Sequence, residues 1–153
     1  MNKSRYQFLG MLFAASLLFI SSCKNSEASS SQSKEVIITQ QRLACLGTCP
    51  VYVAKIYSDG SVMFTGEQYV PKTGETEFKI TKKELESIVA DFESLNFFSL
   101  EDSYTANISD GMTTYISYKK GETEKRIMDY HGAPEGLREL EEKIQSTLFG
   151  YLK

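Results

Sequence analysis

The dipeptide Asp59-Gly60 most constrains the fold of this chain, because it lies in the middle of a run rich in β-forming residues, 51–66. Asp-Gly between two such runs is the strongest short-range signal for a β-hairpin, since a type I′ turn needs positive φ at both central positions. A two-residue turn pairs Tyr57 with Val62. In that register both faces carry apolar side chains, which predicts a hairpin inside a sheet or covered on both sides.

Other short runs rich in β-forming residues indicate further strands. Residues 113–119 and 122–129 flank Lys120-Gly121 and are expected to form a second hairpin. Two further strand candidates are residues 35–41 and 75–80.

Two segments carry helical periodicity. In the first, Thr81 and Glu84 have the spacing of a capping box, in which each side chain satisfies a backbone N–H near the other. The apolar stripe that follows, with helical spacing, is expected to face the core. Its members are Leu85, Ile88, Val89, Phe92 and Leu95.

The second helix is expected to begin with Pro134 at its first helical position, where the missing N–H would be unpaired anyway. Its inward residues are predicted to be Leu137, Leu140, Ile144 and Leu148. Its outward residues are predicted to be Glu135, Arg138, Glu141, Glu142 and Lys143. Phe149 and Tyr151 are expected to pin the C-terminus.

The order of these elements is strands, helix, strands, helix. Strands that come as hairpins predict a mostly antiparallel sheet, and two amphipathic helices cover one face of it. The sequence therefore predicts a single α+β domain over residues 35–153, a mostly antiparallel sheet of hairpins with two amphipathic helices packed on one face. It does not predict the strand order.

The N-terminal residues 1–22 read as a secretory signal, because Lys3 and Arg5 precede a short apolar run. A run of 13 residues is shorter than the roughly 20 that a membrane-spanning helix needs. The segment ending at Cys23 resembles the lipobox of bacterial lipoproteins, although Ile20 stands where leucine is usual. The resemblance implies that Cys23 carries diacylglycerol on its sulfur and an added fatty acid such as palmitate. The alternative is an ordinary signal peptide with a chance cysteine.

Residues 23–34 are expected to form a flexible tether, because 5 of residues 24–34 are serine and none is large and apolar. Lipid chains on Cys23 are expected to hold the protein on a membrane, since each buried methylene contributes about 0.8 kcal/mol. We expect the bacterial cell envelope, at the outer membrane, as the location.

The charge excludes an electrostatic nucleic-acid binder. The chain has 17 basic and 20 acidic side chains, and removal of Lys3 and Arg5 leaves 15 and 20, a net charge of −5. Nucleic-acid binders need clustered Lys and Arg to neutralise phosphates.

Cys45 and Cys49 are expected to form a structural disulfide, since export places them in an oxidising compartment. A redox-active pair remains open, although Pro50 and a β-rich run follow, whereas reactive pairs precede a helix. Metal binding also remains open, but Cys45, Cys49 and His131 supply at most three of the four ligands that zinc prefers.

His131 is the lone histidine and is considered as a general base. Asp129 lies two residues away, and hydroxyl candidates are Thr113, Thr114 and Ser117. No G-x-S-x-G nucleophile motif accompanies them. A turn residue is the alternative interpretation.

Two other groups of residues carry weaker hypotheses. Glu101, Asp102 and Asp110 have oxygen ligands suited to calcium, but their spacing matches no EF-hand loop. Four tyrosines around the second hairpin form either a binding surface or part of the packing. They are Tyr104, Tyr115, Tyr118 and Tyr130.

Three motifs together resemble a family of unknown function. They are C-x-G-x-C-P-x-Y at residues 45–52, the Asp59-Gly60 hairpin, and Gly-Ala-Pro at residues 132–134 before a helix. The family is a domain of unknown function found in envelope lipoproteins of Bacteroidetes-type bacteria, and the resemblance spans residues 41–147. It implies a location and a fold, but no activity, cofactor or catalytic residue.

We therefore expect a lipid-anchored envelope lipoprotein with a small non-enzymatic binding or assembly domain, whose ligand is an envelope protein or a small molecule. No catalytic residue, cofactor or metal is assigned. The alternative is an envelope thiol-redox or hydrolytic enzyme that uses Cys45 and Cys49 or His131. Bonded, buried sulfurs without a nearby cleft argue against the redox enzyme, whereas a deep polar pocket around His131 argues against the non-enzymatic interpretation.

Overall fold

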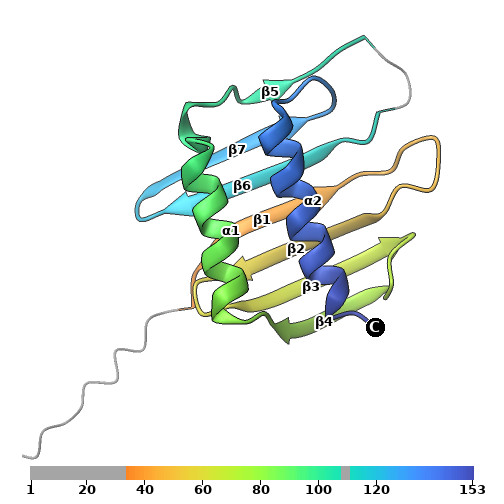
Figure 1. The fold of residues 1–153 in the computed structure, drawn as a ribbon. Coiled ribbons are helices and arrows are strands. Elements are labelled where there is room, and N and C mark those ends of the chain that lie inside the picture. The colour runs from red at the N-terminus through yellow and green to blue at the C-terminus, as the bar shows by residue number, and fades with distance from the viewer. Residues whose placement is uncertain (1–33, 108–110) are drawn as a thin grey trace, which may run out of the picture. The chain divides into compact units, whose positions relative to one another are not determined.

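The computed structural model describes residues 34–107 and 111–153. The expected signal segment, Cys23 and all of the tether except Lys34 lie outside these residues. In the described part, two helices cover one face of a seven-stranded sheet (Figure 1). This architecture confirms the predicted α+β class, with a mostly antiparallel sheet. Among the described helices, none has the length and apolar content to span a bilayer.

The chain builds the sheet as a meander and then returns to its first strand. The strands are β1 (Val36–Arg42), β2 (Val51–Tyr57), β3 (Ser61–Gln68), β4 (Gly74–Lys79), β5 (Ser103–Tyr104), β6 (Thr114–Lys120) and β7 (Thr123–Asp129). The helices are α1 (Lys82–Ser94) and α2 (Glu135–Gly150), with a 3₁₀ turn, η1 (Phe97–Ser99). The spatial order is β4-β3-β2-β1-β6-β7-β5, and only β5 pairs in parallel. Strand β6 therefore uses the edge of β1 that the meander leaves free.

Strand pairing sorts the helix-facing side chains into rows that cross the sheet. One row is Val62, Ile56, Ile38, Tyr118 and Lys125, and the next is Phe64, Ala54, Gln40, Ile116 and Ile127. The third row is Gly66, Tyr52, Arg42, Thr114 and Asp129. The first two rows are largely apolar and supply the core, whereas the third is polar across its last three strands.

The first hairpin forms where it was predicted, but its register is one residue away from the expectation. Ile56, not Tyr57, pairs with Val62. The connection is a three-residue loop in which the Gly60 N–H donates to the Tyr57 carbonyl at 2.9 Å and Gly60 has φ +83°. Asp-Gly also suits this longer turn, whose last residue is left-handed. The shift by one residue moves Val62 to the core face, because neighbouring side chains of a strand point to opposite sides.

The corrected register also changes how the hairpin is covered. Its helix-facing side is apolar except for the Tyr52 hydroxyl, and the other side carries Lys55 and Thr65 among its members. The hairpin lies inside the sheet, as expected, but the helices cover only one face (Figure 1).

The second hairpin turns at Gly121-Glu122 rather than at Lys120-Gly121. Lys120 pairs with Thr123, which leaves a two-residue loop with φ +59° at Gly121. Positive φ at the first central position is typical of a type II′ turn, where glycine has no side chain to clash.

Helix α1 begins with the predicted capping box. The Glu84 N–H donates to the Thr81 hydroxyl at 3.2 Å, and the Thr81 N–H donates to the Glu84 carboxylate at 2.8 Å. Ile88 and Phe92 of the apolar stripe are fully buried, and Phe92 stacks on Tyr118 of β6 at a ring distance of 4.4 Å. The stripe is therefore a core face, as predicted.

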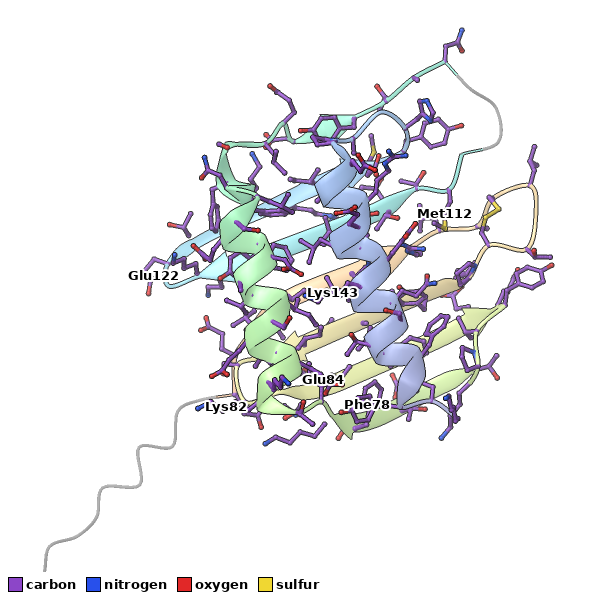
Figure 2. The ribbon with its side chains drawn as sticks, in the orientation of Figure 1. Phe78, Lys82, Glu84, Met112, Glu122 and Lys143 are labelled. Atoms are coloured by element: carbon purple, nitrogen blue, oxygen red, sulfur yellow. A yellow bond between two sulfur atoms is a disulfide. The ribbon has the colours of Figure 1, made fainter. Side chains whose placement is uncertain are left out.

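The end of the chain packs where the sequence predicted. Phe149 approaches the Tyr52 ring at 5.6 Å, and Tyr151 stacks on Phe78 at 5.4 Å. The Tyr151 hydroxyl also donates to Glu84 at 2.6 Å, so the last residues are tied to the start of α1. Figure 2 labels Glu84 on α1 and Phe78 on the neighbouring strand β4.

Helix α2 differs from the prediction at two residues. Pro134 is its N-cap, and the helix begins at Glu135. Glu141, expected to point outward, is only 3 % exposed. The reason is its position on the helix, four residues after Leu137 and three before Ile144, which places it on the apolar stripe.

Candidate functional site

A cluster of buried polar side chains occupies one end of the sheet under α2. Arg42, Thr114 and Asp129 are the last three members of the polar row, on adjacent strands β1, β6 and β7. Glu141 of α2 lies over them. Their exposed fractions are 6 %, 2 %, 7 % and 3 % in that order, so all four polar side chains have been removed from water. Such groups are costly to bury unless they are hydrogen-bonded.

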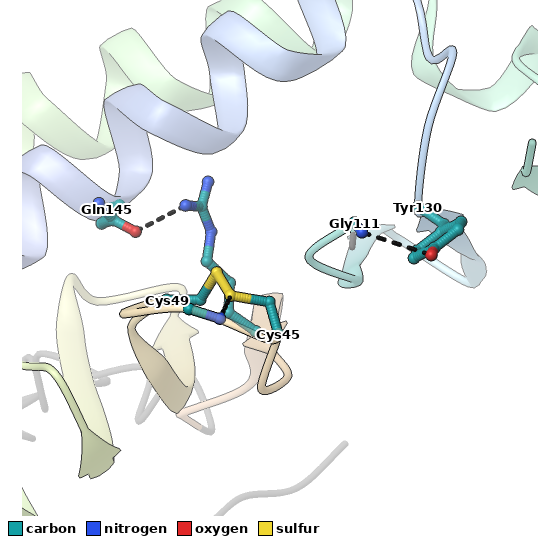
Figure 3. Close-up of a disulfide and its surroundings, with 7 residues drawn as sticks. Cys45, Cys49, Gly111, Tyr130 and Gln145 are labelled. Carbon is teal, nitrogen blue, oxygen red and sulfur yellow. Dashed lines mark hydrogen bonds between the residues drawn. A yellow bond between two sulfur atoms is a disulfide. The ribbon is translucent and has the colours of Figure 1, made fainter. Parts of the chain in front are cut away.

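A chain of hydrogen bonds holds α2 over this cluster. The Tyr52 hydroxyl donates to the Gln40 amide oxygen at 2.9 Å, and the Gln40 amide nitrogen donates to the Glu141 carbonyl at 2.9 Å. A guanidinium nitrogen of Arg42 donates to the Gln145 amide oxygen at 2.7 Å (Figure 3). These bonds explain why Gln40, in an otherwise apolar row, is completely buried.

Three polar atoms of the cluster lack a partner. Arg42 Nε, Asp129 Oδ1 and Glu141 Oε1 are buried and accept or donate no hydrogen bond. Within the described residues, no ion pair of 4.0 Å or less joins Arg42 to either carboxylate. A buried polar group without a partner costs about 1–3 kcal/mol. Three in one place therefore indicate a site that is completed by something outside the chain.

These atoms belong to residues that line a pocket of about 270 Å³. Its lining residues are Arg42, Gly111, Met112, Thr114, Asp129, Tyr130, His131, Gly132, Arg138, Glu141 and Glu142. His131, Arg138 and Glu142 are exposed and form the rim, so the polar cluster is the floor. The pocket thus opens to solvent beside the start of α2.

Tyr130 supplies an aromatic ring to the pocket. The Gly111 N–H donates to its hydroxyl at 3.3 Å (Figure 3). A Cβ at Gly111 would come within 2.6 Å of a Tyr130 ring carbon, so only glycine allows this close approach.

Burial changes the acidity of both carboxyls. Burial raises the pKa of Glu141 to about 8, and the nearby Asp129 raises it further while Arg42 opposes the rise. Burial also raises the pKa of Asp129, against the attraction of Arg138 and a hydrogen bond from the Ala133 N–H. A carboxyl with a pKa near 8 is mostly protonated at pH 7 and becomes a hydrogen-bond donor. Perturbed carboxyls in a cleft are typical of functional sites.

The Sγ atoms of Cys45 and Cys49 lie at bonding distance in the loop that follows β1 (Figure 3). Both residues are partly exposed, and neither lines the polar pocket. Strand β2 follows Cys49 and Pro50, so the pair does not lie at a helix N-terminus, where the dipole would favour a thiolate.

His131 lies at the rim of the pocket, close enough to Asp129 to affect the pKa of that carboxyl. Of the hydroxyl candidates, only Thr114 lines the pocket, and its side chain is hydrogen-bonded to Glu141. Ser117 lies on the sheet face away from the helices. A polar pocket therefore does border His131, the condition under which the sequence favours an enzyme.

The described residues of the acidic connection do not gather a cation site. Asp102 forms an ion pair with Lys125 at 2.8 Å, Glu101 is exposed, and Asp110 lies outside the described residues. In residues 34–107 and 111–153, no three Asp, Glu, His or Cys side chains lie close enough to hold a metal ion.

The four tyrosines do not share one surface. Tyr118 is in the core, 4 % exposed, and donates to Glu93 at 3.0 Å. Tyr115 lies on the uncovered sheet face under the Arg126 guanidinium at 4.2 Å. Tyr104 packs at the core edge, and only Tyr130 lines the polar pocket.

Sequence reasoning missed Arg42, Gln40 and Glu141. A usable signal was present in β1, where Gln40 and Arg42 are in phase with the apolar Ile38 and alternate with less buried positions. Polar residues at core-facing positions of a strand are exceptions that need an explanation. The same reading applies to Glu141 on its apolar stripe.

The fold and the pocket define a two-layer α+β domain with a polar site under its second helix. Residues 36–148, more than half of the chain, match the family described as Domain of unknown function (DUF6438). The chain belongs to this family, and the expectation of a domain of unknown function is confirmed. Among curated proteins, none matches the chain in sequence.

Proposed function

We propose that this protein is a lipid-anchored envelope lipoprotein whose domain binds a small polar ligand in the pocket under α2. One observation carries the binding function. Three buried polar atoms of Arg42, Asp129 and Glu141 lack partners and belong to residues that line the same pocket. A ligand that pairs with them recovers the free energy that their burial costs, about 1–3 kcal/mol for each atom.

The anchor is supported by the sequence. The basic start, the short apolar run and the lipobox-like end at Cys23 are typical of exported lipoproteins. The serine-rich residues 24–34 then separate Cys23 from the folded domain. This arrangement suits a domain that meets its ligand next to a bacterial outer membrane.

The side chains that line the pocket favour binding over catalysis. Its buried hydroxyl, Thr114, is engaged with Glu141. The two sulfurs at bonding distance are not among its lining residues. A covalent mechanism needs a nucleophile activated by a base within hydrogen-bond reach. The base in contact with Thr114 would be Glu141, whose pKa of about 8 leaves it mostly protonated at pH 7 and so unable to accept the hydroxyl proton.

An acid–base enzyme is the second candidate, because His131 borders a pocket with two carboxyls of raised pKa. Such groups transfer protons in catalysis without a protein nucleophile. Incubation with nitrophenyl esters and nitrophenyl glycosides tests this candidate. Turnover that disappears in both His131→Asn and Glu141→Gln would establish it in place of a pure binding function.

The binding function is tested by nuclear magnetic resonance on the full-length chain. The Nε–H resonance of Arg42 is the readout, and that of Arg126, on the opposite face over Tyr115, is the internal control. Titration with panels of sugars, amino acids and small anions should shift the Arg42 resonance saturably and leave Arg126 unchanged. If no compound of any class moves the Arg42 resonance, the proposed function is wrong.

A further inference from the structure

We propose that the ligand of this pocket is a neutral hydroxylated ring of the size of one monosaccharide. This inference rests on the proposed binding function and specifies its ligand. It follows from three properties of the pocket, which are the hydrogen-bonding character of its floor, the balance of its charges, and its size and aromatic wall.

The floor offers one donor and one acceptor that lack partners. Arg42 Nε donates and cannot accept, whereas Asp129 Oδ1 as a carboxylate oxygen accepts. A hydroxyl group accepts from the first and donates to the second at the same time. Adjacent hydroxyls on a ring supply a further partner for the Glu141 carboxyl, protonated or not. Hydrogen bonds to charged groups are also stronger than those between neutral groups.

The charges around the pocket favour a neutral ligand. The floor carries one positive group, Arg42, and two carboxyls, and the rim carries the exposed Arg138 and the exposed Glu142, so both parts contain groups of both signs. An anion on the floor would meet the unpaired oxygen of Asp129, and a cation would meet the unpaired Nε of Arg42. Either ion would lose its hydration shell and find no surrounding of uniformly opposite charge to compensate for that loss. A hydroxylated neutral molecule has no such charge to desolvate.

The size and one wall of the pocket fit a single ring. Pockets for drug-sized ligands measure about 300–1,000 Å³. The volume of about 270 Å³ falls just below this range, so the pocket suits a smaller molecule. Tyr130 contributes an aromatic ring and Met112 a thioether to the lining. The C–H face of a sugar ring is apolar enough to pack on such a wall while its hydroxyls point to the floor.

The test is a titration of the full-length chain, read by the Arg42 Nε–H resonance. The neutral probes are glucose, galactose, mannose and N-acetylglucosamine, and the charged probes are inorganic phosphate, glutamate, ethanolamine and the zwitterion alanine. We expect at least one neutral sugar to give a saturable shift, and none of the charged probes to do so.

Variants connect the shift to the pocket. Asp129→Asn removes the charged acceptor and should weaken sugar binding at least tenfold, and Tyr130→Leu, at a partly exposed position, should weaken it severalfold. Asp102→Asn is the matched control, because the Asp102 side chain is exposed and pairs with Lys125. This variant should bind like the wild type. If Asp129→Asn does not fold, Tyr130→Leu alone decides.

The outcomes separate the inference from the proposed function. Saturable binding of a charged probe, with no neutral sugar bound, overturns the ligand class and keeps the binding site. Sugar binding that neither Asp129→Asn nor Tyr130→Leu weakens places the sugar elsewhere and also overturns the inference. Failure of all eight probes overturns the ligand class, and failure of the wider panels overturns the binding function as well.

Discussion

Arg42 and Asp129 lie in the same row of the sheet, two strands apart, because Thr114 of β6 pairs with both of them. The guanidinium and the carboxylate stand near each other without forming an ion pair of 4.0 Å or less. One guanidinium nitrogen of Arg42 donates a hydrogen bond to Gln145, and the Asp129 carboxyl accepts one from the Ala133 N–H. The remaining atoms, Arg42 Nε and Asp129 Oδ1, are buried and have no hydrogen-bond partner in the described part of the chain.

Glu141 should make the protein less stable as the pH rises. Its pKa is raised from an ordinary value of 4.5 to about 8 in the folded state, so between these values the unfolded chain loses a proton that the folded chain keeps. The free energy of unfolding therefore falls from about pH 4.5 to about pH 8 and is level above that. The free energy of unfolding is measured in urea at pH 5.5 and at pH 8.5. Between these two values it should fall by at least about 2 kcal/mol more in the wild type than in Glu141→Gln, since one pKa unit corresponds to 1.36 kcal/mol.

Glu142→Gln is the matched control for this measurement, because Glu142 is the exposed neighbour on the same helix. It should keep the pH dependence of the wild type. Equal slopes for the wild type and Glu141→Gln would mean that the Glu141 carboxyl is ionised in the folded protein at neutral pH.

Removal of both loop cysteines should destabilise the domain without unfolding it. A disulfide between Cys45 and Cys49 closes a loop of five residues, which corresponds to about 2 kcal/mol in the chain-entropy account. Cys45→Ser with Cys49→Ser should therefore lower the melting temperature by roughly 5–10 °C.

Thiol titration of denatured, unreduced Cys23→Ala should find no free sulfhydryl. Two free thiols in that titration would show that the cysteines do not pair in the cell.

Loss of the Thr81 cap should weaken the start of α1. Thr81→Ala removes the hydroxyl that accepts from the Glu84 N–H, and such caps contribute about 1 kcal/mol. Lys83→Ala is the control, because Lys83 is exposed in the first turn of α1 and its loss leaves the cap in place. Urea unfolding of the two variants should differ by about this amount. A Thr81→Ala variant as stable as Lys83→Ala would mean that the Tyr151 hydroxyl bond to Glu84 holds the helix start by itself.

Cys23→Ala should move the protein from the membrane to the soluble fraction. A cysteine is the only side chain that accepts a thioether-linked lipid at this position, so its loss removes the proposed anchor. Cell fractionation with detection of the folded domain measures the change. Ser22→Ala, which keeps the cysteine next to a small residue, is the control and should remain on the membrane. Membrane association of Cys23→Ala would contradict the lipid anchor.

Local patterns were enough to predict most of the elements but not all of their details. Alternation of side chains and helical periodicity depend on neighbours within a few residues, so the hairpins, the capping box at Thr81 and the apolar stripes emerged from the sequence. The register of the first hairpin did not, because Asp59-Gly60 suits both a two-residue and a three-residue turn. The difference was settled by which face buries Val62 and Phe64 against the helices.

The candidate site was decided by the tertiary structure. From the sequence, Asp129 and Thr114 were expected only as hypothetical partners of a catalytic His131, and Glu141 was expected in solvent. Arg42, Asp129 and Glu141 come together only because β6 pairs with the free edge of β1 and α2 crosses above them. That pairing joins residues more than 70 positions apart, and no local propensity encodes it. Local sequence patterns were thus sufficient for the family, the elements and the expected export, whereas the polar pocket exists only because long-range strand pairing and the packing of α2 bring its residues together.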